Sequence, residues 1–140
     1  MRDVKFKAYI YDLTDEDSHP LEIDVRAGKL WDVVSINFKD RIVEIMDDDG
    51  NVWEYELSSD EIALVQYTGL KDQNNAEIYE GDIVKGNFIK DNSEAVGKIA
   101  YFNKDASFIC HLQGGDYALL ISLERLEVVG NIYENPEILQ

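Results

Sequence analysis

The chain has 140 residues, of which 13 are Lys or Arg and 29 are Asp or Glu, so its formal net charge is −16. Phosphate backbones and anionic membrane surfaces are bound mainly through basic residues, and this excess of acids argues against both as direct ligands. With 45% hydrophobic residues, the chain has enough apolar material to fold as one domain or as two small lobes.

The single cysteine, Cys110, cannot form an intramolecular disulfide. Two charged residues follow Met1 directly, and no apolar run has the length of a signal peptide or of a membrane span. These features favour a cytoplasmic protein that does not insert into a membrane.

Strict alternation of apolar and polar residues runs through the first segment, residues 4–12. This period of two is typical of a β-strand. One face carries Val4, Phe6, Ala8 and Ile10, and the other carries Lys5, Lys7, Tyr9 and Tyr11. A loop around Pro20 and a turn at Gly28 follow, before a second expected strand that ends near Asn37.

A β-hairpin is expected over residues 41–57, where Asp49-Gly50 separates two β-rich runs. Asp-Gly is typical of a two-residue type I′ turn, because both central residues need a positive φ. Residues 58–61 then have the Ser-x-x-Glu form of a capping box, yet Gly69 leaves room for only about two helical turns. Either a short helical turn or another strand fits this segment.

Short strands separated by tight turns fill the second half of the chain. Turns are expected at Asn74-Asn75, at Gly81-Asp82, at residues 103–105 and at Gly114-Gly115, with strands at 96–102 and 107–112. Five short strands in about 65 residues are typical of a small barrel, because closure removes exposed strand edges. We therefore expect a mainly β fold with little helix, with an N-terminal antiparallel β lobe over residues 1–66 and an SH3-like barrel over residues 67–140.

Aromatic residues are numerous for a small β protein, and at least Tyr9 and Tyr11 lie opposite the apolar face of their expected strand. Exposed aromatic rings bury a large area at small entropic cost, so they suit a recognition surface. The candidate interaction surface comprises Tyr9, Tyr11, Trp31, Trp53 and Tyr55. The alternative, that these rings pack between the lobes or between subunits, is the more economical interpretation.

Residue patterns that would carry catalysis or bind metal are missing from the sequence. Cys110 and His111 are adjacent on an expected strand, so their side chains point to opposite faces and cannot pair as nucleophile and base. The acidic run at residues 47–49 lacks the ligand spacing of a calcium loop, and no Cys-x-x-Cys or His-x-x-x-His pair indicates zinc. We expect no cofactor, no metal ion and no catalytic residue.

Two blocks of the sequence contain unusual strings: residues 65–86, with QYTGLKD and EIYEGDIV, and residues 126–139, with GNIYENPE. In order and separation they resemble the YopX-like family of small phage and prophage proteins. Asn75 stands where that family usually has Gly, and Asn is the next most tolerant residue for a positive φ. The resemblance implies a mostly β protein with an SH3-type C-terminal part, encoded by a phage or prophage, that acts inside the bacterium and forms homo-oligomers. It brings no catalytic or binding residues.

Three functions fit these observations. The preferred hypothesis is a non-enzymatic phage accessory protein that acts through contacts with a protein partner or with itself. The second is an acidic mimic of nucleic acid that binds a host or phage DNA-binding protein, which requires carboxylates clustered on one face. Residues 1–70 hold 17 acidic and 7 basic residues, and residues 71–140 hold 12 and 6. The third is a small hydrolase using Glu80 and Asp82, whose side chains share a face if their segment is extended.

Overall fold

The computed structural model describes residues 3–12 and 25–139, and β-strands dominate this part of the chain. The mainly β fold with little helix is confirmed. The elements in chain order are β1 (Phe6–Ile10), β2 (Lys29–Asn37), β3 (Ile42–Met46), β4 (Val52–Glu56), β5 (Ile62–Lys71), β6 (Glu77–Tyr79), β7 (Asp82–Phe88), β8 (Glu94–Phe102), β9 (Ser107–Leu112), β10 (Tyr117–Leu119), the 3-10 helix η2 (Leu120–Ser122), β11 (Leu123–Asn131) and the 3-10 helix η3 (Pro136–Leu139). The loop expected around Pro20 lies outside the described residues. No helix in the described ranges is long and apolar enough to cross a membrane.

Two compact units make up the chain: Lys5–Val65, and the residues from Gln66 onward together with those up to Val4. Strand β5 begins in the first unit and ends in the second. Each unit has a hydrophobic core of its own. We refer to them as the N-terminal unit and the C-terminal unit.

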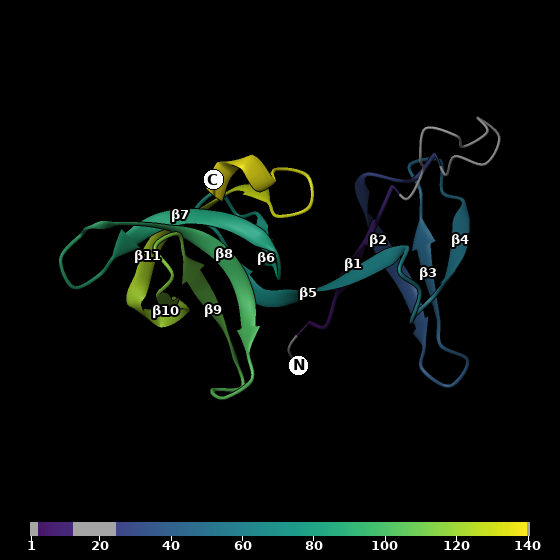
Figure 1. The fold of residues 1–140 in the computed structure, drawn as a ribbon, viewed down its shortest axis with the longest axis horizontal. Helices are drawn as coiled ribbons and strands as arrows, with labels where there is room; N and C mark the ends of the chain where they lie inside the picture. The colour runs from purple at the N-terminus through teal and green to yellow at the C-terminus, as the bar shows by residue number, and fades with distance from the viewer. Residues whose placement is uncertain (1–2, 13–24, 140) are drawn as a thin grey trace. The chain divides into compact units, whose positions relative to one another are not determined.

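In the N-terminal unit, the strand order is β4-β3-β2-β1-β5, with antiparallel pairing of β1 to β2, β2 to β3 and β3 to β4 (Figure 1). Alternate residues of these strands point to one face of the sheet, as their period of two predicts. The core formed on that face comprises Ala8, Ile10, Trp31, Val43, Ile45, Tyr55 and Ile62.

The predicted hairpin is present as β3 and β4, which pair from Ile42 and Glu56 at one end to Met46 and Val52 at the other. Its turn is not the predicted two-residue type I′ turn, since residues 47–51 separate the paired positions. The carboxylate of Asp47 closes this longer loop, because Oδ1 accepts hydrogen bonds from the N–H groups of Asp49 at 3.0 Å and of Asn51 at 2.8 Å. Backbone bonds also close the turn, since Gly50 N–H donates to the Asp47 carbonyl at 3.1 Å and Asp47 N–H donates to the Asn51 carbonyl at 2.9 Å.

The segment after the Ser-x-x-Glu motif is a strand, β5, and not a helical turn. Ser59 Oγ does accept a hydrogen bond from Glu61 N–H at 3.0 Å, as in the first turn of a helix. The β-branched and aromatic residues that follow favour extended backbone, and the chain continues as a strand to Lys71.

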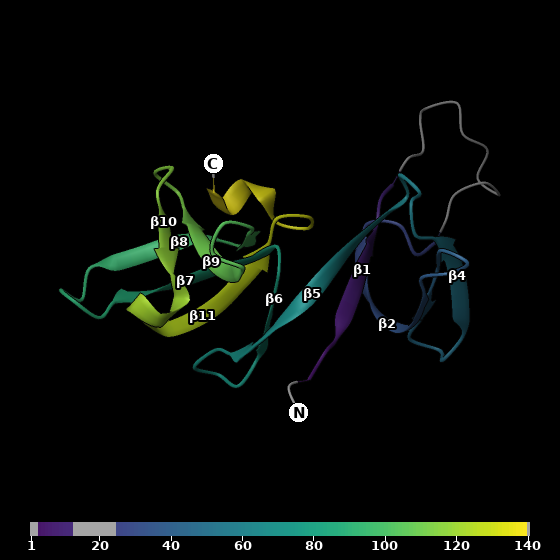
Figure 2. The same ribbon diagram turned by 90° about the horizontal axis from the view of Figure 1, so that it is seen from below.

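The C-terminal unit contains a five-stranded antiparallel sheet in the order β10-β9-β8-β7-β11, together with the antiparallel pair β5-β6. Figures 1 and 2 show that the five-stranded sheet is strongly curved. The core of this unit comprises Ile78, Val84, Ala95, Ile99, Cys110, Ala118 and Leu123. The closed barrel that the sequence led us to expect is not formed, because β10 and β11 are the two edges of the sheet. The 3-10 helix η2 connects β10 to β11.

Candidate functional site

Two of the five candidate aromatic residues, Trp31 and Tyr55, lie in the core of the N-terminal unit and are 9% and 7% exposed. Arg26 contacts both of them. Its Nε donates a hydrogen bond to Tyr55 Oη at 2.7 Å, and its backbone carbonyl accepts one from Trp31 Nε1 at 2.9 Å. These two rings therefore pack inside the fold and not on its surface.

Trp53 lies on the same face of β4 as Tyr55 but remains 39% exposed. The guanidinium carbon of Arg26 lies 3.7 Å from the centre of the Trp53 ring, a close cation–π contact. Trp53 Nε1 also donates a hydrogen bond to Asp47 Oδ2 at 2.8 Å, and this bond is the main reason why the pKa of Asp47 lies below its ordinary value. Trp53 thus links the hairpin loop to Arg26 and keeps part of its ring on the surface.

Tyr9 and Tyr11 form an edge-to-face pair with ring centres 5.1 Å apart. Tyr11 is 38% exposed and Tyr9 is partly buried. Among the five predicted residues, Tyr11 and Trp53 are thus the ones with substantially exposed rings. Contact of either ring with a partner stays a prediction.

Cys110 and His111 lie on opposite faces of β9, as their adjacency predicts. Cys110 is 1% exposed, and burial raises the pKa of its thiol to about 11. His111 is exposed. A thiol with such a pKa carries almost no thiolate near neutral pH, which is the form that attacks electrophiles.

Glu80 and Asp82 flank Gly81, whose φ of 87° turns the chain between β6 and β7. The backbone is therefore not extended at this point, so the condition for the two carboxylates to share a face is not met. Asp82 is 8% exposed, and its Oδ2 accepts a hydrogen bond from Tyr79 N–H at 2.8 Å. Within residues 3–12 and 25–139, no group of three His, Cys, Asp or Glu side chains could hold a metal ion.

Asp72 ties together the two sequence blocks at residues 65–86 and 126–139. Its Oδ2 accepts a hydrogen bond from Val128 N–H at 2.9 Å, and its Oδ1 accepts from Asn74 N–H at 2.8 Å and Ala76 N–H at 2.9 Å. These bonds, above all the one from Val128, hold the pKa of Asp72 below its ordinary value. Asp72, the last residue of the string QYTGLKD, therefore has a structural role: it holds the loop after β5 against β11.

A surface groove of about 780 Å³ lies in the C-terminal unit. It is lined by the C-terminal half of β5, the turn between β6 and β7, the tip of the β8-β9 hairpin and the segment from β10 into η2. Its large apolar lining residues are Leu70, Tyr101, Phe108, Leu119, Leu120 and Ile121. We call this feature the β5-η2 groove.

The apolar lining of the β5-η2 groove is unusually exposed for side chains of this type. Ile121 is 84% exposed, and Leu70, Tyr101 and Leu119 are each more than 40% exposed. The rings of Tyr101 and Phe108 pack edge to face with their centres 5.3 Å apart. Contiguous exposed apolar surface of this kind marks sites that bind another molecule more often than it marks ordinary surface.

Only a few polar side chains line the β5-η2 groove beside these apolar residues. Gln66 and Thr68 come from alternate positions of β5, Ser107 begins β9, and Glu80 is the charged residue of the groove. Sequence patterns did not single out these groove residues, apart from Glu80. The sequence does place Gln66, Thr68 and Leu70 at every second position of one segment. This local spacing does not reveal which distant segments form the other walls of the groove.

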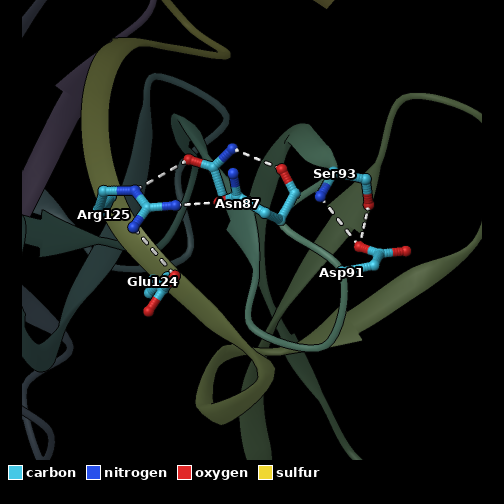
Figure 3. Close-up of polar contacts among 6 residues, drawn as sticks. Asn87, Asp91, Ser93, Glu124 and Arg125 are labelled. Carbon is cyan, nitrogen blue, oxygen red and sulfur yellow. Dashed lines mark hydrogen bonds and ion pairs between the residues drawn. The ribbon is translucent and has the colours of Figure 1, made fainter.

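A polar cluster on β11 and the β7-β8 hairpin involves a residue with strained backbone, Arg125, whose φ is 54° (Figure 3). Its guanidinium donates to Asn87 Oδ1 at 3.4 Å and to Asn92 Oδ1, and it pairs with Glu124 Oε1 at 3.1 Å. All three guanidinium nitrogens thus have acceptors in the same unit. The cluster fastens a bulge of β11 to the hairpin.

Carboxylates gather on the face of the N-terminal sheet opposite its core. Glu44 and Glu54 are directly opposite one another on β3 and β4, and Ser35 Oγ donates to Glu44 Oε1 at 2.7 Å. Glu56 occupies the same face at the next ladder position, and Asp32 lies on that face too, but directly opposite Lys7 of β1. Like charges directly opposite each other destabilise a sheet, so this face carries an electrostatic cost in the isolated chain.

Comparison with known proteins identifies the family of the chain. The model of the family described as YopX protein matches residues 24–140. A crystal structure of protein EF1440 from Enterococcus faecalis is similar over all of both chains, with 22% identity and a TM-score of 0.59. A crystal structure of protein yopX from Bacillus subtilis is similar over the same full extent, with 19% identity and a TM-score of 0.57. No curated protein sequence matches the chain. The chain belongs to the YopX protein family.

Proposed function

We propose that this chain is a phage- or prophage-encoded accessory protein, located in the cytoplasm of the bacterial host, that acts through protein contacts and without catalysing a reaction. The observation that carries the proposal is the exposed apolar lining of the β5-η2 groove. Exposed aromatic and aliphatic side chains around one groove gain free energy when a partner covers them. The preference for contacts over catalysis is supported by the positions of the candidate nucleophile Cys110 and the candidate base Asp82, which are buried in structural roles.

We also propose that the C-terminal unit is an open member of the SH3-like class. Strands β7 to β10 form a consecutive antiparallel meander, and β11 returns beside β7 after the 3-10 helix η2. This connectivity supports the proposal, although edge pairing does not close the sheet. Many functions occur on folds of the SH3-like class, so the assignment of function rests on the groove and not on the fold.

Affinity purification from host cells that carry the phage tests the protein-contact function. The tagged chain is compared with an Ile121→Glu variant, which places a charge in the groove at a residue that is 84% exposed and so spares the core. Phe38→Glu is the matched control, because Phe38 is 73% exposed and lies outside the groove. We expect Ile121→Glu, but not Phe38→Glu, to lose a partner that the unchanged chain retains. Retention of every partner by both variants would contradict the proposal.

Homo-oligomerisation is the form of contact that the family resemblance implies. Light scattering on the purified chain gives its mass directly. A multiple of 16.0 kDa would support self-assembly, and a monomer at high concentration would remove that part of the proposal.

Mimicry of nucleic acid is the second candidate function, and the carboxylate face of the N-terminal sheet favours it. Glu44, Glu54 and Glu56 share that face, and their mutual repulsion falls when a basic partner covers them. Under this alternative, DNA should displace the partner at low salt, and a Glu54→Gln/Glu56→Gln variant should bind it more weakly. Indifference of the complex to both DNA and salt would exclude mimicry.

A further inference from the structure

We propose that the β5-η2 groove takes an extended segment of a partner protein in which an apolar side chain neighbours a Lys or Arg, and that Glu80 selects the basic residue. This inference rests on the proposed function, because it names the chemistry of the partner at the same groove. It makes Glu80 a residue that determines specificity.

The aromatic pair in the lining provides the place for the apolar side chain. Tyr101 and Phe108 meet edge to face at 5.3 Å, with Leu120 and Ile121 following in the same lining. Tyr101 is 46% exposed, so a large part of this aromatic surface is covered only when an occupant is present. An apolar side chain that fills such a site contributes through the area it removes from water and through ring contacts.

Charge complementarity favours a Lys or Arg in the occupant beside its apolar side chain. Glu80 is the charged residue of the lining, and the other polar side chains there, Gln66, Thr68 and Ser107, are neutral. Within the described ranges no hydrogen bond or ion pair engages the Glu80 carboxylate. A carboxylate beside apolar walls attracts a cation more strongly than one in open water, and the net charge of −16 disfavours acidic occupants.

The shape of the lining favours an extended segment. Gln66 and Thr68 present alternate positions of β5 to the groove, and Leu70 lines it beyond the irregularity at Gly69, whose φ is 88°. An extended peptide repeats its side chains with the same period of two, so it can place successive side chains along this strand. A second copy of this acidic chain fits less well, because Glu80 would face a surface of the same charge sign.

Selection of peptides from a displayed random library on the full chain, with Ile121→Glu as the counter-selection, tests the inference. The most enriched peptide is then synthesised in three versions, with its basic residue kept, replaced by Gln or replaced by Glu. Fluorescence anisotropy of the labelled peptides gives the three affinities. We expect the basic version to bind about tenfold more tightly than the Gln version, the effect of one charge-assisted hydrogen bond.

Charge reversal at the groove provides the decisive comparison. Glu80→Lys should make the Glu version of the peptide the tightest binder, whereas Glu94→Lys, the same change at an exposed residue outside this groove, should leave the order unchanged. Circular dichroism checks that both variants fold. If Ile121→Glu abolishes peptide binding but Glu80→Lys leaves the order of the three affinities unchanged, the inference is overturned and the proposed function still stands. A dimer that Ile121→Glu dissociates would show that a second copy occupies the groove, and would also overturn the inference.

Discussion

At the residue scale, Asp72 shows how one buried carboxylate joins distant parts of the chain. It accepts backbone hydrogen bonds from Asn74 and Ala76 in the loop after β5 and from Val128 on β11. Its negative charge strengthens all three bonds. Asp72→Asn keeps an acceptor but turns one oxygen into a donor, which would then face the Val128 N–H group. We expect the free energy of unfolding at neutral pH to fall by about 1.5–3 kcal/mol, measured by urea denaturation followed by circular dichroism.

The pH dependence of the same residue has a defined sign. Its pKa in the folded chain lies below the ordinary value of 3.8, so the stabilisation is fully present above that value. It is lost as the pH falls through the lower, folded pKa. The stability difference between the original chain and Asp72→Asn should therefore shrink on acidification below about pH 4. A constant difference over that range would show that the charge of Asp72 does not contribute.

The burial of Cys110 predicts slow reaction of its thiol in the folded chain. The thiol is 1% exposed with a pKa raised by burial to about 11, so both access and thiolate content are low. We expect the native chain to react with a thiol reagent at pH 8 at least 100-fold more slowly than the urea-unfolded chain, on the order of the thiolate deficit alone. Equal rates would mean that Cys110 is accessible and ionisable, contrary to its place in the core.

At the element scale, the pairing of β8 with β9 depends on a position without a side chain. A Cβ atom on Gly97 would lie 2.3 Å from the backbone oxygen of His111 on the neighbouring strand, which cannot move without breaking the ladder. We expect Gly97→Ala to destabilise the C-terminal unit by about 2–3 kcal/mol. Gly114→Ala is the control, because a Cβ there meets nothing within 4 Å. Similar stability of the two variants would contradict the observed register.

The elements also show what a sequence can and cannot reveal. Alternation predicted the strands, and Asp49-Gly50 predicted the hairpin, because both signals are local. The turn is longer than the Asp-Gly signal predicts, because Gly50 has a positive φ but Asp49 does not, and backbone and Asp47 side-chain hydrogen bonds close it together. Trp53 and Tyr55 are two positions apart on one strand, yet Tyr55 lies in the core and Trp53 is partly exposed, and both contact Arg26 from another segment. The β5-η2 groove could not be predicted, since its walls lie as far apart in sequence as Gln66 and Ile121.

At the scale of the whole molecule, the two cores predict separable unfolding. Both tryptophans, Trp31 and Trp53, lie in the N-terminal unit, so tryptophan fluorescence reports on that unit alone. Circular dichroism reports on the strands of both. We expect Gly97→Ala to shift the circular dichroism transition in urea while the fluorescence midpoint stays in place. Equal shifts in both signals would show that the units unfold together.

The central claim is that the β5-η2 groove contacts another protein, and photo-crosslinking inside the host cell tests it most directly. A photoreactive phenylalanine analogue replaces Ile121 in the groove and, in a parallel chain, Phe38 outside it; both positions are highly exposed. We predict a discrete crosslinked product from position 121 that is missing from position 38, with mass spectrometry identifying the second protein. Crosslinks of the same pattern from both positions, or none from position 121, would contradict the claim.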